Sequence, residues 1–438
     1  MDGVDQYLAS AERDAATLPE LQGVQPRTVQ HVAVIGAGTM GSGIAIACLE
    51  SGCAVTLLEL DALALERGAG RIGEHFARRV AAGKLDAPRA AECASRLHAT
   101  TDWELLVRAD LVIEAVFEDL GVKREVFARI DRAARPAALL ATNTSYLDVD
   151  AIAAATSRPQ DVLGLHFFSP ANVMRLLEVV RGRATSGEAL ASALALATRL
   201  RKKPVVTGNA FGFVGNRVFS AYRRQCEFML EEGALPEQVD AALEAFGFAM
   251  GPFAVADLSG LDIAWRMRRS RAATRDAGHR YVRIPDLLCE AGRLGRKSGA
   301  GYYRYEVAGA KSRGTPDPQV RRLIEDESGR KGLPRRTLDA AEIQRRALLA
   351  MVNEASLLLA EGVARRPGDV DVALVNGYGF PRARGGPVFW ARQQAAEALA
   401  ADLRWLAQVS GPGFQAGDPR HVLAAGAGEP RAVVPQSV

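Results

Sequence analysis

The stretch HVAVIGAGTMGSGIAIACLESG, residues 31–52, decides the fold of this chain. An apolar run typical of a buried strand leads into three glycines, and an Ala- and Ile-rich stretch typical of a helix follows. AVTLLEL, residues 54–60, has the pattern of a second strand. Strand, glycine-rich turn, helix and strand together predict a βαβ unit, the building block of a doubly wound α/β sheet.

The glycine-rich turn has the spacing of a dinucleotide-binding site. Gly36 permits a tight turn, Gly38 lets the backbone approach a pyrophosphate, and Gly41 lets the helix pack close to the strand. The positive end of that helix, which includes Thr39 and Met40, then lies on the phosphates. We therefore predict a bound dinucleotide. The alternative is a tight turn in an ordinary α/β domain.

Glu59 closes the second strand, and no arginine follows immediately, because Leu60 and Asp61 come next. A carboxylate at this position accepts hydrogen bonds from both ribose hydroxyls and repels a 2′-phosphate. The sequence therefore predicts NAD rather than NADP.

Further apolar runs continue the sheet. They are ADLVIEAV (109–116), ALLATNTS (138–145), VLGLHFF (162–168), RLLEVV (175–180) and KPVVTG (203–208). Runs of this length indicate strands that are buried on both faces. We expect one doubly wound, Rossmann-type sheet over residues 28–208, with ligands beyond the carboxyl ends of its strands. Polar residues gather at these ends, namely Glu118, Lys123, Ser145 and His166.

The segment HFFSPANVMRLLE, residues 166–178, has a histidine at one end and a glutamate at the other. We expect Pro170 to turn the chain so that Glu178 returns alongside His166. The carboxylate would then fix the imidazole tautomer and stabilise the imidazolium that forms when a base takes a proton, as NAD-dependent alcohol oxidation requires. Spacing alone leaves an alternative, a buried histidine satisfied by backbone groups with the glutamate on a solvated edge.

Five motifs in this order resemble the L-3-hydroxyacyl-CoA dehydrogenase family: GAGTMG, IEAVFEDLGVK, NTSYL, HFFSPANVMRLLEVV and FGFVGNR. The resemblance covers nearly the whole chain. It is greatest for the dehydrogenase part of the multifunctional β-oxidation enzymes, which also carry segments similar to LGRKSGAGYYRYE (294–306) and YGFPRARGGPVFW (378–390). It implies oxidation of an (S)-3-hydroxyacyl-CoA to a 3-ketoacyl-CoA, with NADH as the second product.

The resemblance also implies residue roles at the reacting atoms. In the family, the histidine and glutamate of the HFF motif are the catalytic base and its orienting partner, which here are His166 and Glu178. The serine of NTS and the asparagine of GNR hydrogen-bond the region of the reacting oxygen, which implies Ser145 and Asn216.

Two further positions follow from the EDLGVK motif, whose acid and lysine lie on the nicotinamide side in the family and correspond to Glu118 and Lys123. One position departs from part of the family. Many short members have asparagine where Ser169 stands, whereas the multifunctional type has serine, so the substrate contact at this position stays open.

The second half of the chain has helical periodicity and an internal repeat. EGALPEQVDAALEAFGFAMGPF (232–253) and EGVARRPGDVDVALVNGYGFPRARGGPVF (361–389) share EG, VDxAL, GF and GP, which predicts two tandem, duplicated all-α domains. Where the first copy has Asn216, the second has Arg345, so we expect a structural role for the second copy. In the short family members the helical domain pairs with that of another subunit. The tandem copy therefore predicts a monomer with an internal pseudo-dimer.

These features predict five segments. They are an N-terminal extension or linker (1–27), the NAD-binding domain (28–208), a first helical domain (209–306), a linker with a short helix (307–337) and a second helical domain (338–438). Nothing in the sequence resembles a crotonase-type hydratase. We therefore expect dehydrogenation without hydration, with a hydratase and a thiolase as possible separate partners.

Composition limits the other possibilities. The chain has 55 Lys and Arg against 51 Asp and Glu, dispersed along its length, which argues against nucleic acid as a partner. No charge-free run is long enough for a membrane span, and the acidic N-terminus is unlike a secretory signal. Five cysteines without paired spacing indicate no metal site and a reduced, cytoplasmic location.

Three other functions are compatible with parts of the sequence. A β-hydroxyacid dehydrogenase needs a catalytic lysine where FGFVGNRV stands without one. A sugar-acid or other hydroxyacid dehydrogenase of the same His–Glu family stays an alternative, although the long tandem C-terminal half points away from it. A catalytically silent, crystallin-like protein would have no need to keep four polar residues in one crevice.

Overall fold

The computed structural model describes residues 3–306, 309 and 313–424, which divide between two compact units. The first unit contains the chain up to Asn216 together with Glu361–Tyr378. The second contains Arg217–Ala360 and the chain from Gly379 onward. This division differs from the predicted boundaries, because residues 361–378 of the expected second helical domain belong to the unit that holds the sheet.

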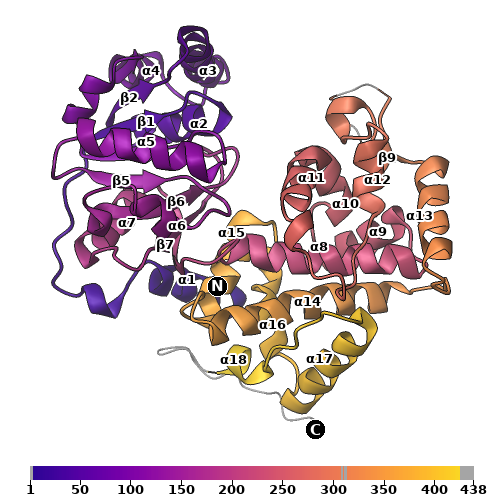
Figure 1. Ribbon diagram of the computed structural model, residues 1–438. Helices are drawn as coiled ribbons and strands as arrows, with labels where there is room; N and C mark the ends of the chain where they lie inside the picture. Colours follow the sequence, from indigo (N-terminus) through magenta and orange to yellow (C-terminus); the bar gives the residue numbers. More distant parts are fainter. Residues whose placement is uncertain (1–2, 307–308, 310–312, 425–438) are drawn as a thin grey trace. The chain divides into compact units, whose positions relative to one another are not determined.

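The first unit is built on an eight-stranded sheet with the order β3-β2-β1-β4-β5-β6-β7-β8. Figure 1 labels β1, β2, β5, β6 and β7 of this sheet. The strands are β1 (His31–Ile35), β2 (Ala54–Leu58), β3 (Leu97–Thr100), β4 (Leu111–Glu114), β5 (Leu139–Thr142), β6 (Val162–Phe167), β7 (Leu176–Arg181) and β8 (Lys203–Gly208). The six strands β1 to β6 run parallel to one another. Strand β7 is antiparallel to β6 and parallel to β8. The predicted Rossmann-type sheet is confirmed. Its strand order reverses between β1 and β4, where such sheets bind ligands.

Strand β3 was not expected from the sequence. It lies at the edge of the sheet, and two of its four residues, His98 and Ala99, are exposed. An edge strand buries less side-chain surface than a central one, so the segment LHAT lacks the apolar run by which the other strands were recognised.

Alternate residues of the strands face two apolar cores, one on each face of the sheet. In β1, Val32 and Val34 pack with residues of α2, α3 and α7, whereas Ala33 and Ile35 pack with α5 and α6. The elements that cover the sheet are η1 (Pro19–Leu21), α2 (Thr39–Glu50), α3 (Ala62–Ala81), α4 (Ala87–Ser95), η2 (Trp103–Arg108), α5 (Leu120–Ala133), α6 (Val149–Ala153), η3 (Pro159–Asp161) and α7 (Gly187–Arg199). This coverage explains why the strands are apolar on both faces.

Two helices from opposite ends of the sequence pack together in this unit. They are α1 (Gly3–Ala15) and α15 (Pro367–Gly377), and α15 also lies against β7 and β8. The Tyr7 hydroxyl donates to Oδ2 of buried Asp371 at 2.6 Å, and the backbone N–H of Gly208 in β8 donates to the carbonyl of Val363 at 2.9 Å. Residues 3–15, expected within an extension or linker, therefore form a packed helix, because their apolar side chains face one side and are buried.

The second unit is helical. Its elements are α8 (Gly215–Glu232, whose first two residues belong to the first unit), α9 (Pro236–Phe246), α10 (Pro252–Ser259), α11 (Leu261–Ser270), η4 (Ala272–Thr274), α12 (Ile284–Glu290), η5 (Arg296–Ser298), β9 (Tyr303–Arg304), β10 (Thr315–Pro316), α13 (Pro318–Arg330), α14 (Ala340–Ala360), η6 (Arg382–Arg384), α16 (Pro387–Arg392), α17 (Ala396–Ser410) and α18 (Pro419–Leu423). The expected linker 307–337 contains β10 and α13, and α13 packs against α12. Positions 307–308 and 310–312 of that linker lie outside the described residues.

The segment LGRKSGAGYYRYE is anchored by Asp257 of α10. Its carboxylate accepts hydrogen bonds from the backbone N–H groups of Tyr302 and Tyr303, at 2.8 and 2.9 Å, and from the Tyr305 hydroxyl at 3.0 Å. Burial raises the pKa of Asp257 to about 6. A Cβ atom on Gly301 would lie 1.9 Å from the carboxylate, so this motif requires a glycine there to close around the acid.

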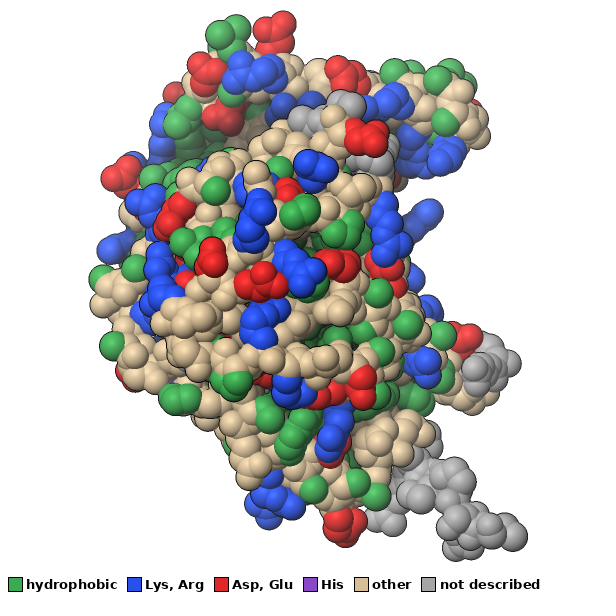
Figure 2. Space-filling model, turned by 90° about the vertical axis from the view of Figure 1, so that its right-hand side faces the viewer, with side chains coloured by type: hydrophobic (Ala, Val, Ile, Leu, Met, Phe, Trp, Pro, Cys, Tyr) green, Lys and Arg blue, Asp and Glu red, His purple; other side chains and the backbone are tan. Residues whose placement is uncertain are grey.

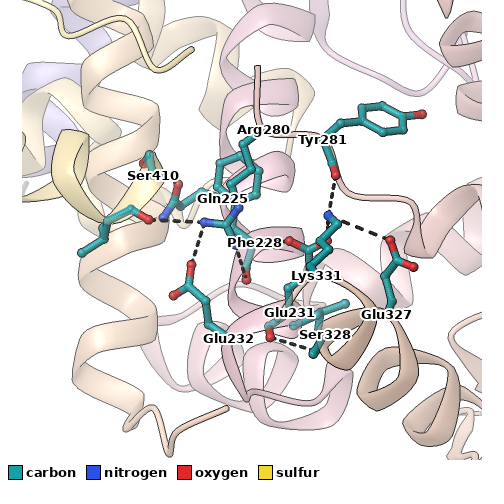
Figure 3. Close-up of polar contacts among 12 residues, drawn as sticks. Gln225, Phe228, Glu231, Glu232, Arg280, Tyr281, Glu327, Ser328, Lys331 and Ser410 are labelled. Carbon is teal, nitrogen blue, oxygen red and sulfur yellow. Dashed lines mark hydrogen bonds and ion pairs between the residues drawn. The ribbon is translucent and has the colours of Figure 1, made fainter. Parts of the chain in front are cut away.

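A cluster of charged side chains surrounds the carboxyl end of α8 (Figure 3). Glu231 is fully buried and pairs with Lys331 and with Arg280, the latter at 3.2 Å. Glu232 pairs with Arg280 at 2.9 Å and with Arg346 of α14, whose side chain is fully buried. Burial alone would raise the pKa of Glu232, but hydrogen bonds and charge attraction from Arg346 and Arg280 lower it. The cluster joins segments that are far apart in the sequence.

We expect Glu232→Gln to lower the free energy of unfolding by about 3 kcal/mol at pH 7, because buried Arg346 loses the closer of its charged partners and keeps Glu342, at 3.8 Å. The pKa of Glu232 is lower in the folded protein, so its stabilisation is present above the unfolded value of about 4.3 and is lost as the pH falls through the folded value. Urea unfolding should therefore show a smaller difference between variant and wild type at about pH 3.5 than at pH 7.

The control for this measurement is Glu397→Gln, because Glu397 is an exposed acid in the first turn of α17. We expect it to change the free energy of unfolding by less than about 0.5 kcal/mol. An equal loss for Glu232→Gln at both pH values would contradict the role assigned to its charge.

Basic and acidic side chains are interspersed on the face shown in Figure 2. Among the described helices, none has the length and apolar character needed to cross a bilayer. Within the same part of the chain, no three His, Cys, Asp or Glu side chains are grouped so that they could hold a metal ion. The five cysteines are buried, free thiols.

Candidate active site

His166 and Glu178 face each other across β6 and β7. The antiparallel register pairs the two residues directly, and His166 Nδ1 lies 2.8 Å from Glu178 Oε2. His166 is 5% exposed and Glu178 is fully buried. The two ends of the HFFSPANVMRLLE segment are therefore together, because a chain that reverses between paired strands brings residues twelve apart into cross-strand contact.

The remaining oxygen of Glu178 is held by the start of helix α8. Oε1 accepts hydrogen bonds from the backbone N–H groups of Val214 and Gly215, at 3.1 and 2.9 Å. Free N–H groups at a helix N-terminus favour a negative charge. The carboxylate is thus fixed on both sides, and this fixes the imidazole in turn.

Ser145 and Asn216 extend this arrangement beyond the imidazole. Ser145 follows β5, and its Oγ lies 3.2 Å from His166 Nε2. Asn216 is in the first turn of α8, and its Nδ2 donates to the Ser145 carbonyl at 3.3 Å. The four residues proposed for the chemistry thus form one connected series, Glu178–His166–Ser145–Asn216.

Aromatic rings border the histidine. The ring of Phe168 lies 4.3 Å from the imidazole and that of Phe213 lies 5.7 Å from it, centroid to centroid. Phe168 also contacts Tyr378, which follows α15 and was not singled out from the sequence. Apolar walls of this kind reduce the access of water to the base.

Glu118 and Lys123 occupy different environments. Glu118 is partly exposed, and its Oε1 accepts hydrogen bonds from Thr144 Oγ1 at 2.6 Å and from the backbone N–H of Ser145 at 2.8 Å. Lys123 is fully buried, with its Nζ 2.7 Å from Glu114 Oε1 and 3.5 Å from Glu118 Oε2. Sequence reasoning missed Glu114, although an acid at the end of an apolar strand, as at Glu59, was a usable signal.

The glycine-rich turn has the geometry that a pyrophosphate needs. Gly36 has φ +99°, and a Cβ atom there would lie 2.7 Å from the Ala115 carbonyl oxygen. A Cβ on Gly41 would lie 1.8 Å from the Gly36 carbonyl oxygen, whereas a Cβ on Gly38 would meet no atom within 4 Å. Close packing therefore requires glycine at positions 36 and 41. Gly38 leaves open space beside the start of α2.

Glu59 lies beside this turn. Its Oε2 accepts a hydrogen bond from the Ala37 N–H at 2.9 Å, and its Oε1 accepts one from the Leu60 N–H at 2.8 Å. Thr39 and Met40 form the first residues of α2. Arg71 of α3 donates a hydrogen bond to the Ala37 carbonyl. A half-buried carboxylate next to an open turn fits the ribose and phosphates of NAD.

Known protein families match two successive parts of this chain. Residues 31–210 match the family described as "3-hydroxyacyl-CoA dehydrogenase, NAD binding domain", and residues 212–305 match its "C-terminal domain". The crystal structure of 3-hydroxybutyryl-CoA dehydrogenase from Escherichia coli is 30% identical, with a TM-score of 0.74 over 88% of this chain and 97% of that chain. The chain belongs to the 3-hydroxyacyl-CoA dehydrogenase family.

Multifunctional members of this family also match. The "Peroxisomal bifunctional enzyme" of Danio rerio is 43% identical over 420 residues, which are 91% of this chain and 57% of that protein. The structure of the dehydrogenase part of multifunctional enzyme 1 from C. elegans is 28% identical, with a TM-score of 0.66 over 92% of this chain and 93% of that chain. The chain thus spans a little over half the length of the curated relatives it matches.

The predicted cytoplasmic location is wrong. The curated relatives from fish, mammals and plants are named peroxisomal or glyoxysomal proteins. Buried free thiols do not distinguish these compartments, so cysteine usage alone was not a sufficient basis for the prediction.

Proposed function

We propose that this chain oxidises a 3-hydroxyacyl-CoA to the 3-ketoacyl-CoA with NAD, as a step of fatty-acid β-oxidation. The observation that carries the proposal is the buried His166–Glu178 pair at the carboxyl end of β6, with Nδ1 2.8 Å from the carboxylate. Membership of the 3-hydroxyacyl-CoA dehydrogenase family supports the substrate class.

His166 is the proposed general base. Glu178 accepts from Nδ1, which leaves the lone pair of Nε2 on the side of Ser145. Nε2 takes the proton of the substrate's 3-hydroxyl, and Glu178 stabilises the imidazolium that results. When NAD is bound, its nicotinamide supplies the acceptor for the hydride, which leaves the carbon that bears the 3-hydroxyl. The protein's contribution is a base of fixed tautomer and orientation.

Ser145 and Asn216 are proposed to hold the reacting oxygen. The Ser145 hydroxyl lies 3.2 Å from His166 Nε2, within reach of the same substrate atom. Asn216 contributes an amide N–H on the same side, since its Nδ2 already reaches the Ser145 carbonyl. Neutral donors placed at the oxygen favour the carbonyl that forms as the hydride leaves.

The proposed cofactor-binding residues are Gly36, Gly38, Thr39, Met40, Gly41, Glu59, Glu118 and Lys123. Glu118 is accessible enough to contact the nicotinamide side directly. Lys123 is fully buried, so we propose that it acts through Glu118, whose Oε2 is 3.5 Å away. The resemblance implied only that both residues lie on the nicotinamide side.

We also propose that the two helical segments arose by duplication. In each, a long helix is followed by an 11-residue helix that begins with proline, α9 or α15, and then by a short helix that begins with the proline of a Gly-Pro pair, α10 or α16. A tandem copy can replace a second subunit, which supports a monomer. Light scattering at micromolar concentration should give a mass near 46.8 kDa, and a stable dimer would contradict the proposal.

The function is tested by measuring NADH formation from NAD with 3-hydroxybutyryl-CoA, gulonate and 3-hydroxyisobutyrate. We expect turnover with the CoA thioester alone. Turnover with gulonate or 3-hydroxyisobutyrate alone would show a different hydroxyacid dehydrogenase, and no turnover with any substrate would favour a silent structural protein. Crotonyl-CoA is included in the same series. We expect no hydration of it, because we propose dehydrogenase activity alone for these residues.

A further inference from the structure

Asn216 has a second partner from a distant part of the chain. While Nδ2 donates to the Ser145 carbonyl at 3.3 Å, Oδ1 accepts from the Tyr378 hydroxyl at 2.8 Å. Tyr378 caps the carboxyl end of α15 and lies 162 residues after Asn216. A carbonyl only accepts and this phenol donates, so the two contacts specify one orientation of the Asn216 amide.

The Tyr378 ring is held against the same site. It packs edge-on against Phe168, at 5.4 Å between centroids and 75° between planes, and Phe168 in turn contacts the imidazole of His166. A Cβ atom on Gly215 would lie 2.2 Å from the Tyr378 ring, so the ring fills the space that a side chain at 215 would need. Gly215 therefore lets the ring reach the first turn of α8.

Burial raises the pKa of the Tyr378 hydroxyl well above its usual value, and the nearby Glu178 acts in the same direction. The hydroxyl therefore stays protonated over the whole pH range in which a histidine base works. It is a permanent donor to Asn216.

We propose that Tyr378 is a positioning residue that fixes the amide of Asn216 toward the reacting oxygen, so that the second helical copy contributes to the active site. This inference rests on the proposed function and changes the purely structural role that we expected for that copy. Without the hydroxyl, the amide keeps its 3.3 Å contact with the Ser145 carbonyl but loses the partner of Oδ1, so its orientation is held by one hydrogen bond instead of two.

The test is Tyr378→Phe, which removes one oxygen and keeps the ring. We expect kcat with 3-hydroxybutyryl-CoA to fall about tenfold, the size of a lost neutral hydrogen bond, while the Kd for NAD changes by less than twofold. In an Asn216→Ala background the same substitution should change kcat by less than twofold, because its effect passes through the amide. Tyr7→Phe is the control: it removes a hydroxyl bonded to Asp371 of α15, and should affect stability without affecting kcat.

A crystal structure of the Tyr378→Phe variant determines the orientation of the Asn216 amide without a measurement of turnover. We expect the Asn216 amide to leave its wild-type orientation toward the Ser145 carbonyl. An unchanged orientation of the Asn216 amide would overturn the inference. Effects of Tyr378→Phe and Asn216→Ala on kcat that multiply independently would overturn it as well. If wild-type protein forms no NADH, the proposed function fails, and the amide orientation in the two structures still decides whether Tyr378 positions Asn216.

Discussion

His166→Ala should lower kcat for NADH formation from 3-hydroxybutyryl-CoA by at least about 100-fold, the usual range for removal of a general base. The His166–Glu178 pair is buried, and alanine removes the Nε2 atom that lies 3.2 Å from Ser145 Oγ. The Kd for NAD should change by less than about twofold, because the glycine-rich turn and Glu59 are at other strand ends. Steady-state kinetics and calorimetry with NAD measure the two quantities separately.

The matched control is His98→Ala. His98 is an exposed histidine on β3, at the edge of the same sheet, and its removal should leave kcat unchanged within about twofold. A loss of less than about threefold for His166→Ala, in protein that still binds NAD, would exclude His166 as the base.

Glu178→Gln should lower kcat by roughly 10- to 100-fold and change its pH dependence. The amide has the shape of the carboxylate but no charge, so the imidazole is less basic and the imidazolium is less stabilised. The acidic limb of the kcat profile should therefore move to lower pH. The new NH2 group must also face either the imidazole or the N–H groups of Val214 and Gly215, which adds a local cost in stability.

Glu50→Gln is the matched control for this second variant. Glu50 forms another His–Glu contact, with Oε1 3.1 Å from His75 Nε2, and neither residue belongs to the proposed site. The substitution should leave kcat and its pH profile unchanged. An identical pH profile for Glu178→Gln and wild type would show that the carboxylate does not act on the base.

The sequence located most of the proposed site because its residues lie on local patterns. His166 and Glu178 sit on consecutive strands, and their spacing alone left open whether they meet. The resemblance to the family decided that prediction, and the antiparallel register places the two side chains in contact. Ser145 is three residues beyond the end of β5. Glu114 and Tyr378 were missed for different reasons. Glu114 was a strand-end acid that was overlooked. Tyr378 opens the quoted segment YGFPRARGGPVFW, but nothing in that segment indicates a contact with Asn216, 162 residues away.

The sequence by itself determined the βαβ start of the sheet and the glycine positions, because backbone sterics and strand alternation act between near neighbours. The tertiary structure alone decided that α1 packs on α15 and that Tyr378 meets Asn216, across separations of 364 and 162 residues. Such contacts depend on which apolar faces are left to be buried once the sheet has formed. No short-range pattern in the chain encodes that choice.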